Sequence, residues 1–297
     1  MANIDAVIAV AGWEERFEEG LRLDLDSYRP SKLLVFVFKE YLADTKRRRA
    51  DISDFAKARK VEYKEVAVKR DPIQLWTAVR DTFSEREWSQ GSAVVDISTM
   101  PREVIWWTFS WLRSSHSEIR YVYYKPRSYA TDWLTRDTDQ PRLVYQHSGV
   151  SEFGKHTCLL LLSGFDNDRA AQMIQFFEPR LVLVGQQSGT QYDNQVKNAE
   201  QSKRLLERTP HITFFDVDAY SSDHGLAAIE NIISGKLAEF NIVAASLGPK
   251  PSAVALYQLY LKHPEIALAY APSRQFNPKY SAGIGDCVQG VLVGSGQ

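Results

Sequence analysis

The stretch VVDISTMPREV, residues 94–104, joins an apolar run directly to a helical run that begins at a proline. Four polar side chains gather where the two runs meet: Asp96, Ser98, Thr99 and Arg102. A buried strand that passes at once into a helix is the building unit of a parallel α/β sheet. The stretch therefore predicts one βα unit, with its polar groups at the carboxyl end of the strand.

The same junction occurs a second time in the chain. The run FNIVAASLGPKPSA, residues 240–253, repeats the apolar strand, the serine, the proline and the positive charge. Four further pairs of runs recur in the same order: AVIAVAGWEERF with CLLLLSGFDNDRA, KLLVFVF with RLVLVGQ, VEYKEVAV with ITFFDVDAY, and IRYVYYKP with IALAYAP. Strand-like runs that repeat at a nearly constant offset indicate an internal duplication.

The expected fold class is α/β, with two tandem Rossmann-like parallel-sheet units related by this duplication and by a pseudo-twofold axis. We expect the units at residues 1–126 and 155–273. The linker, 127–154, holds the strand-like run RLVYQ and the tail, 274–297, holds DCVQGVLV; we expect both as edge additions or cross-braces. The helical runs EVIWWTFSWL and SAVALYQLYL are apolar nearly all round, which predicts burial under the linker and tail or against each other.

Composition narrows the classes of function. The 297-residue chain has a formal net charge of −1, which excludes a global field that attracts nucleic acid. Its basic run KRRR, residues 46–49, lies beside Asp51 and Asp54 in a charged helical stretch, so direct nucleic-acid binding is not expected. The two cysteines and six histidines lack ligand spacing, so we expect neither metal nor cofactor. Because no leader pattern or bilayer-length apolar run is present, we expect a cytoplasmic protein without membrane contact.

The two fourth-strand junctions are candidate anion sites. In open parallel sheets, ligands bind beyond the carboxyl ends of the strands, and the free N–H groups of a helix start attract phosphate. Pro101 and Pro249 suit a first helical turn. The candidate ligand-binding side chains and glycine here are Ser98, Thr99, Arg102, Ser246, Gly248 and Lys250. The alternative is purely structural, with the hydroxyls capping helices and Arg102 pairing with a nearby acid.

The loops after the first strand of each half form a second pair of candidates. They contain Gly12, Trp13, Glu14, Glu15 and Arg16 in the first half, and Gly164, Phe165, Asp166 and Arg169 in the second. The aromatic rings suit stacking on a base, and the arginines suit either phosphate binding or pairing with the adjacent acids. Acids are favoured in a first helical turn by the helix dipole alone, which is the structural alternative.

With both junctions in view, the chain resembles the CARF family, the Rossmann-like ligand sensors of prokaryotic defence systems. The stretches DISTMPRE and ASLGPKPSA are similar to that family's fourth-strand motif, a hydroxyl and glycine turn that ends in lysine or arginine. The resemblance implies domains paired about a twofold axis that bind cyclic oligoadenylate across the loops after the first and fourth strands. The positions that it carries over are Ser98, Thr99, Arg102, Ser246, Gly248, Lys250, Gly12 and Gly164.

Two main functional hypotheses follow, from different classes. The first is a sensor or adaptor that binds a nucleotide-type anion and passes that state to a partner protein in antiviral defence. The second is an enzyme that hydrolyses a nucleotide or nucleoside with Asp96, Glu14 and Glu15 as catalytic carboxylates. Asp96 occurs in the first half only, because Ala244 stands at the matching position. A third possibility is a structural subunit in which these junctions only cap and pair.

Overall fold

The five apolar runs of the first half form five parallel strands of one sheet. These are β1 (Ala6–Val10), β2 (Lys32–Phe38), β3 (Glu62–Val68), β4 (Ala93–Asp96) and β5 (Glu118–Tyr124). Their order across the sheet is β3-β2-β1-β4-β5, and the tail strand β16 (Cys287–Val293) adds an antiparallel edge beside β5. The structure, a computed structural model, describes residues 4–88, 91–116, 118–164, 166–188 and 211–293.

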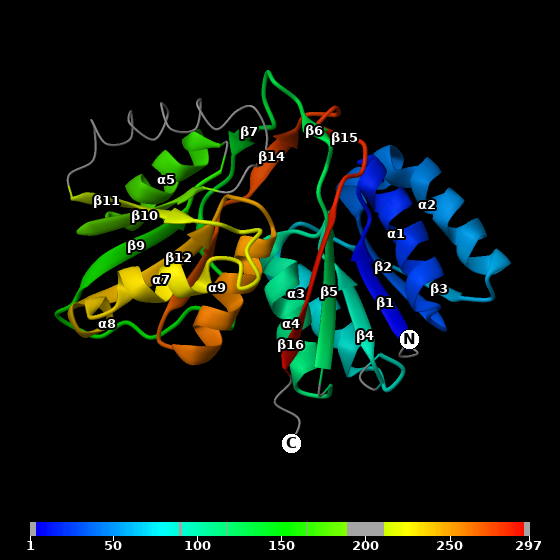
Figure 1. The fold of residues 1–297 in the computed structure, drawn as a ribbon, viewed down its shortest axis with the longest axis horizontal. Helices are drawn as coiled ribbons and strands as arrows, with labels where there is room; N and C mark the ends of the chain where they lie inside the picture. The colour runs from blue at the N-terminus through cyan, green and yellow to red at the C-terminus, as the bar shows by residue number, and fades with distance from the viewer. Residues whose placement is uncertain (1–3, 89–90, 117, 165, 189–210, 294–297) are drawn as a thin grey trace. The chain divides into compact units, whose positions relative to one another are not determined.

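Helices cover both faces of this sheet. They are α1 (Glu15–Tyr28), the short η1 (Lys39–Tyr41), α2 (Leu42–Ala58), α3 (Pro72–Ser84) and α4 (Arg102–Arg113). Helices α1 and α2 pack together on one face, and α3 and α4 pack together on the other (Figure 1). Alternate strand residues such as Val7 and Val35 meet Phe17 and Leu21 of α1 in one apolar core. The inner strands β1, β2 and β4 are apolar on both sides because both sides are covered.

The second half repeats the same topology. Its strands are β9 (His156–Leu162), β10 (Leu181–Gln187), β11 (Ile212–Val217), β12 (Phe240–Ser246) and β13 (Ala267–Tyr270). Their order is β11-β10-β9-β12-β13, and β8 (Arg142–Leu143) adds the antiparallel edge beside β13. The helices are α5 (Asn167–Phe177), α7 (Leu226–Ile233), α8 (Lys236–Glu239) and α9 (Pro251–Lys262). The predicted α/β class and the duplicated Rossmann-like topology are confirmed.

The outer strands are exchanged between the two halves of the sequence. The chain divides into a first unit, residues 1–130 with 278–297, and a second unit, residues 131–277. The linker therefore supplies β8 to the second unit, and the tail supplies β16 to the first. Both segments are thus edge strands, as expected, but the units differ from the expected boundaries at 126, 154 and 273, because each sheet recruits its edge strand from the linker or the tail.

Two small antiparallel pairs complete the exchange. In the first unit β6 (Ser128–Tyr129) pairs with β15 (Ser281–Ala282), and in the second β7 (Thr135–Thr138) pairs with β14 (Ser273–Phe276). Each pair thus joins one strand that follows β5 in the chain, β6 or β7, to one strand that follows β13, β15 or β14. When the two halves of a duplicated chain exchange equivalent segments, each unit keeps the same set of strand pairings.

The fourth-strand helices are buried on most sides, as their composition predicts. In α4 the run from Glu103 to Phe109 is buried, and in α9 the run from Pro251 to Tyr257 is buried. Within the first unit α4 packs against α3 and β5, and within the second α9 packs against α7, β12 and β13. Whether α4 and α9 also pack against each other stays a prediction.

Membrane spans and metal sites were also considered in the sequence. Within the described ranges, no helix has the length and apolar content that a membrane span requires. Among the same residues, no group of three or more His, Cys, Asp or Glu side chains is placed to hold a metal ion.

Candidate functional site

The first junction lies at the carboxyl ends of β1 and β4, where two loops pack closely together. We call residues 11–16 and 97–102 the first seam. A Cβ atom on Gly12 would lie 2.8 Å from Cγ2 of Thr99, so glycine allows the two loops to touch. The Thr99 hydroxyl donates to the carbonyl oxygen of Val10 at 2.6 Å. Gly12 and Thr99 therefore join the two strand ends.

Asp96 and Ser98 shape the end of the fourth strand. One carboxylate oxygen of Asp96 accepts from the backbone N–H of Ser98 at 2.8 Å, and the Ser98 hydroxyl oxygen accepts from the N–H of Tyr124 at 2.9 Å. Asp96 is only 1% exposed. By strand register the position equivalent to Asp96 in the second unit is Ala245, not the expected Ala244, and there β12 continues to Ser246 and stays paired with β9. Asp96 thus ends β4 early, by taking the N–H that a continued strand would use.

Glu14 and Arg16 form a buried ion pair at the start of α1. Arg16 Nη2 lies 2.8 Å from Glu14 Oε2, and Arg16 Nη1 donates to the carbonyl oxygen of Tyr124 at 3.3 Å. Glu14 also accepts from the hydroxyl of Ser281 on β15. Burial lowers the pKa of Arg16, but the Glu14 carboxylate and three nearby tyrosines together more than offset it and hold the pKa well above its ordinary value. The pair therefore ties the first loop to the end of β5.

The remaining candidates of the first loop also have structural partners. The second acid, Glu15, accepts from the backbone N–H of Gly283 at 2.6 Å. Trp13 packs its ring against Tyr41 at a centroid distance of 5.2 Å, and its carbonyl oxygen accepts from Nε of Arg48. Partial exposure of Trp13 leaves some of its surface at the seam.

A buried acid that the sequence reasoning missed lies beneath the first seam. Asp24 of α1 is fully buried, and its Oδ1 accepts from the hydroxyl of Tyr124 at 2.7 Å. Burial raises the pKa of Asp24 well above its ordinary value, and the charge of Asp96 raises it further. Asp24 and Asp96 therefore behave as a coupled pair in which Asp24 holds the proton. The only sequence signal is that Asp24 falls on the apolar face of α1, between Leu21 and Leu25.

The second junction is built on the same plan with different residues. We call residues 163–169 and 246–250 the second seam. A Cβ atom on Gly164 would lie 2.0 Å from the carbonyl oxygen of Leu247, and one on Gly248 would lie 2.7 Å from that of Ser163. Both glycines thus permit backbone contact between the loops. The hydroxyl of Ser246 lies 2.6 Å from that of Ser252, inside the unit.

Asp166 and Arg169 reproduce the ion pair of the first seam. Arg169 Nε lies 2.9 Å from Asp166 Oδ2, and Arg169 Nη1 donates to the carbonyl oxygen of Ala271 at 3.1 Å. Asp166 caps α5 by accepting from the N–H of Arg169, and it also accepts from the hydroxyl of Thr135 on β7. In each unit, then, an exchanged segment supplies the hydroxyl that contacts the first-loop acid. Phe165 lies outside the described residues.

The cations of the fourth-strand junctions stand at the helix starts. Arg102 is the first residue of α4, directly after Pro101, and Lys250 is the N-cap residue of α9, directly before Pro251. Both side chains are partly exposed. The prolines differ slightly from the expectation: Pro251, not Pro249, takes the first helical position, and Pro101 precedes the helix. A helix start with an adjacent cation attracts an anion.

The geometry sorts the predicted residues into two groups. The acids, the first-loop arginines and two serines are bound to structural partners inside each unit, which is the alternative that the sequence left open. The members of this group are Glu14, Glu15, Arg16, Asp96, Ser98, Asp166, Arg169 and Ser246. The other described candidates are Trp13, Thr99, Arg102, Gly164, Gly248 and Lys250, which are partly exposed, as Glu15 and Asp166 also are, and Gly12, which is buried.

Comparison with known proteins adds little to this geometry. No protein-family model matches the chain. A search of curated proteins also found no match. Among solved structures, a chain described as a periplasmic ribose ABC transporter from Conexibacter woesei is similar, with 12% sequence identity over 88% of this chain and 70% of that chain, and a TM-score of 0.25. A similarity of that size is no guide to the ligand of this chain.

Proposed function

We propose that this protein binds a nucleotide-type anion at its fourth-strand junctions and acts in the cytoplasm as a sensor or adaptor for a partner protein in prokaryotic defence. The observation that carries the proposal is the placement of Arg102 and Lys250. Each stands at the start of the helix that follows a fourth strand, and each is partly exposed. The resemblance of both junctions to the CARF motif supports a nucleotide rather than a simple anion.

The distribution of charge at the seams supports anion binding. The carboxylates of the two ion pairs are largely buried, and Glu14 and Asp166 are neutralised there by Arg16 and Arg169. The positive groups at the strand ends are thus not opposed by an exposed carboxylate of either pair. Charged donors to phosphate form short, strong hydrogen bonds, and a helix start adds backbone N–H donors.

Hydrolysis is the second candidate, and one observation favours it. The pKa of Asp24 is raised by burial and by the charge of Asp96, and such perturbed carboxyl pairs occur at catalytic sites. A catalytic carboxylate must nevertheless reach the substrate. Asp96 is 1% exposed and already accepts from the Ser98 N–H, so we favour binding over hydrolysis.

A thermal-shift screen tests the proposal. Linear and cyclic adenine nucleotides are added to the full chain, and product formation is followed by chromatography in the same samples. A ligand at about 100 times its Kd stabilises a protein by about 2.7 kcal/mol, which raises Tm by several degrees. We expect such a rise without turnover. No rise with any nucleotide contradicts the proposal, and turnover that Asp96→Asn abolishes without loss of binding selects the enzyme.

A further inference from the structure

A cavity of about 510 Å³ lies at the opposite end of the first sheet from the seam. It borders the amino ends of three neighbouring strands, through Ala6 of β1, Lys32 of β2 and Ala93 of β4. All of its lining residues belong to the first unit. Its volume falls within the range of small-molecule sites. The candidate site described above does not account for it.

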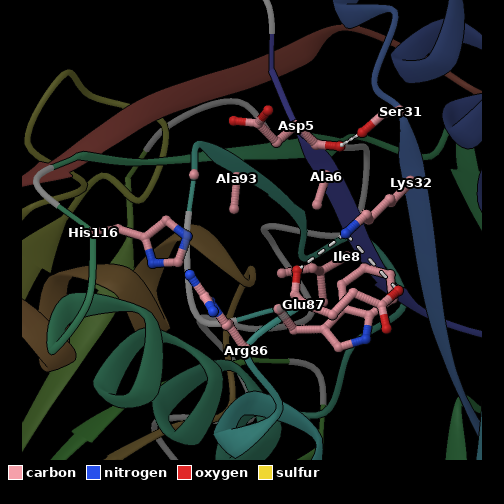
Figure 2. A pocket seen from close by; sticks show the side chains of 11 residues that line it. Asp5, Ala6, Ile8, Ser31, Lys32, Arg86, Glu87, Ala93 and His116 are labelled. Carbon is pink, nitrogen blue, oxygen red and sulfur yellow. Dashed lines mark hydrogen bonds and ion pairs between the residues drawn. The ribbon is translucent and has the colours of Figure 1, made fainter.

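The cavity combines an apolar floor with basic walls. Ala6, Ile8 and Ala93 provide the floor, and the basic side chains are Lys32, Arg86 and His116. They come from three separate segments: the start of β2, the loop after α3 and the loop after α4. Figure 2 shows Lys32 and Arg86 entering the cavity from different sides, with Arg86 directed toward the His116 ring. Segments far apart in the sequence thus bring basic groups to one space.

The charge of Lys32 is only weakly balanced inside the cavity. Its ammonium nitrogen lies 3.3 Å from the neutral carbonyl oxygen of Glu87, whereas the nearest Glu87 carboxylate oxygen is 3.9 Å away. The ammonium also lies over the Trp88 ring, 5.6 Å from its centroid. These contacts hold Lys32 in place while leaving donors for a further acceptor, since an ammonium group has three.

The second acid that lines the cavity, Asp5, hydrogen-bonds to Ser92. Asp5 accepts from both the backbone N–H and the hydroxyl of Ser92, at 2.7 and 2.8 Å. These bonds lower the pKa of Asp5 and bind its carboxylate to the loop before β4. Figure 2 shows that carboxylate turned away from Lys32. Asp5 therefore does not neutralise the lysine directly.

His116 provides a group that responds to a bound anion. Its Nδ1 lies 3.0 Å from the carbonyl oxygen of Leu112 and 2.9 Å from the hydroxyl of Ser115, and these contacts hold the ring in place. Burial lowers the pKa of His116, and the hydrogen bond to Leu112 and the Asp5 carboxylate only partly offset it. The imidazole is therefore neutral at pH 7 and does not repel Arg86. An anion beside the ring would favour its protonated form.

We propose that this cavity binds a small organic oxyanion, with its phosphate or carboxylate group between Lys32 and Arg86 and its apolar part on the floor of Ala6, Ile8 and Ala93. Because the carboxylates of Glu87 and Asp5 also line the cavity, its positive charge suits a ligand with one anionic group and not a polyanion. The site is separate from the seams and does not depend on the proposed function.

Calorimetric titration of the full chain with phenyl phosphate, benzoate and inorganic phosphate tests this site. We expect saturable binding of the two aromatic anions, and inorganic phosphate at least tenfold weaker because it cannot use the apolar floor. Lys32→Gln and Arg86→Gln should each weaken binding at least tenfold. The matched control is Lys64→Gln: Lys64 also lies over the Trp88 ring, at 5.7 Å, but is absent from the cavity lining within the described chain, so it should change binding less than twofold.

A second readout needs no substitution in the cavity. NMR titration of the His116 ring in the wild-type protein should show its pKa rising when phenyl phosphate is bound. Arg102→Ala, at the other end of the sheet, should leave binding intact, which separates this site from the seam. No saturable binding by wild type, an equal loss in Lys64→Gln and Lys32→Gln, or an unchanged His116 pKa at saturation would overturn the proposal.

Discussion

At the scale of single residues, most polar side chains of the two seams hold together the strand ends and helix starts of their own unit. Arg16 and Arg169 each join a first-loop acid to the carbonyl oxygen at the end of a fifth strand. The sequence shows an arginine beside acids in both halves but cannot show which partner it takes. That choice depends on Tyr124 and Ala271, which lie about a hundred residues away in the chain.

Replacing Arg16 by methionine should destabilise the first unit by about 3 kcal/mol or more, because it leaves the buried Glu14 carboxylate without its cation. Chemical denaturation measures the change in the free energy of unfolding. Arg80→Met is the control, since Arg80 pairs with Asp81 at the exposed surface, and it should cost less than about 1 kcal/mol. Equal losses for the two variants would contradict a structural role specific to Arg16.

The coupled acids predict a dependence of stability on pH. The pKa of Asp24 is raised in the folded protein, so its contribution to stability is complete at low pH and is lost as the pH rises through the folded pKa. Asp24→Asn cannot ionise and keeps an acceptor for the Tyr124 hydroxyl. It should therefore raise Tm at pH 8.5 relative to wild type by more than it does at pH 5.5, with a difference of about 2 °C or more.

Differential scanning calorimetry at the two pH values checks this prediction. The matched control is Asp26→Asn, because Asp26 lies on the same helix and makes its ion pair with Arg59 at the surface. A gain for Asp24→Asn that is the same at both pH values would contradict the protonated state of Asp24.

At the scale of elements, the long runs were predictable and most of the shortest strands were not. Runs such as KLLVFVF carry enough apolar residues to predict a buried strand, and all five repeated runs of each half form strands. The run RLVYQ, which contains β8, was expected to form an edge strand, whereas β6 and β15 have two residues each, too few for a periodic pattern. Their partners are set by tertiary contacts, so the exchange between the halves could not be predicted from the sequence.

The tail strand β16 is the clearest test of that exchange. A Cβ atom on Gly290 would lie 2.1 Å from the hydroxyl of the buried Tyr121 on β5. Gly290→Val should therefore displace β16 and cost about 1–3 kcal/mol. Hydrogen exchange should become faster in β5 and stay unchanged in β9 and β10. Val293→Thr, at an exposed position of the same strand, is the control; unchanged protection of β5 in Gly290→Val would contradict the pairing.

At the scale of the whole molecule, the duplication was visible in the sequence because equivalent junctions keep equivalent residues. What differs between the copies was harder to interpret. Asp96 stood out as the candidate for chemistry, yet it ends β4 and raises the pKa of Asp24. A lone acid at a strand end has the same appearance in sequence whether it faces a ligand or a backbone N–H, and only the surrounding packing distinguishes the two.

The placement of cations at both fourth-strand junctions is the feature that the account depends on most. It is repeated in the two units, although the neighbouring residues differ. Arg102 follows Met100 and Pro101, whereas Lys250 follows Gly248 and Pro249. If each unit binds the same kind of anion, as proposed, a charge kept at both junctions while the turn differs is the expected pattern.

Calorimetric titration with the nucleotide that gives the largest thermal shift tests this central claim most directly. Arg102→Ala and Lys250→Ala should each weaken binding at least tenfold, since a hydrogen bond from a charged group contributes about 1.5–3 kcal/mol. Arg47→Ala, at an exposed position of α2, should bind like wild type. Wild-type affinity in both Arg102→Ala and Lys250→Ala would contradict the account.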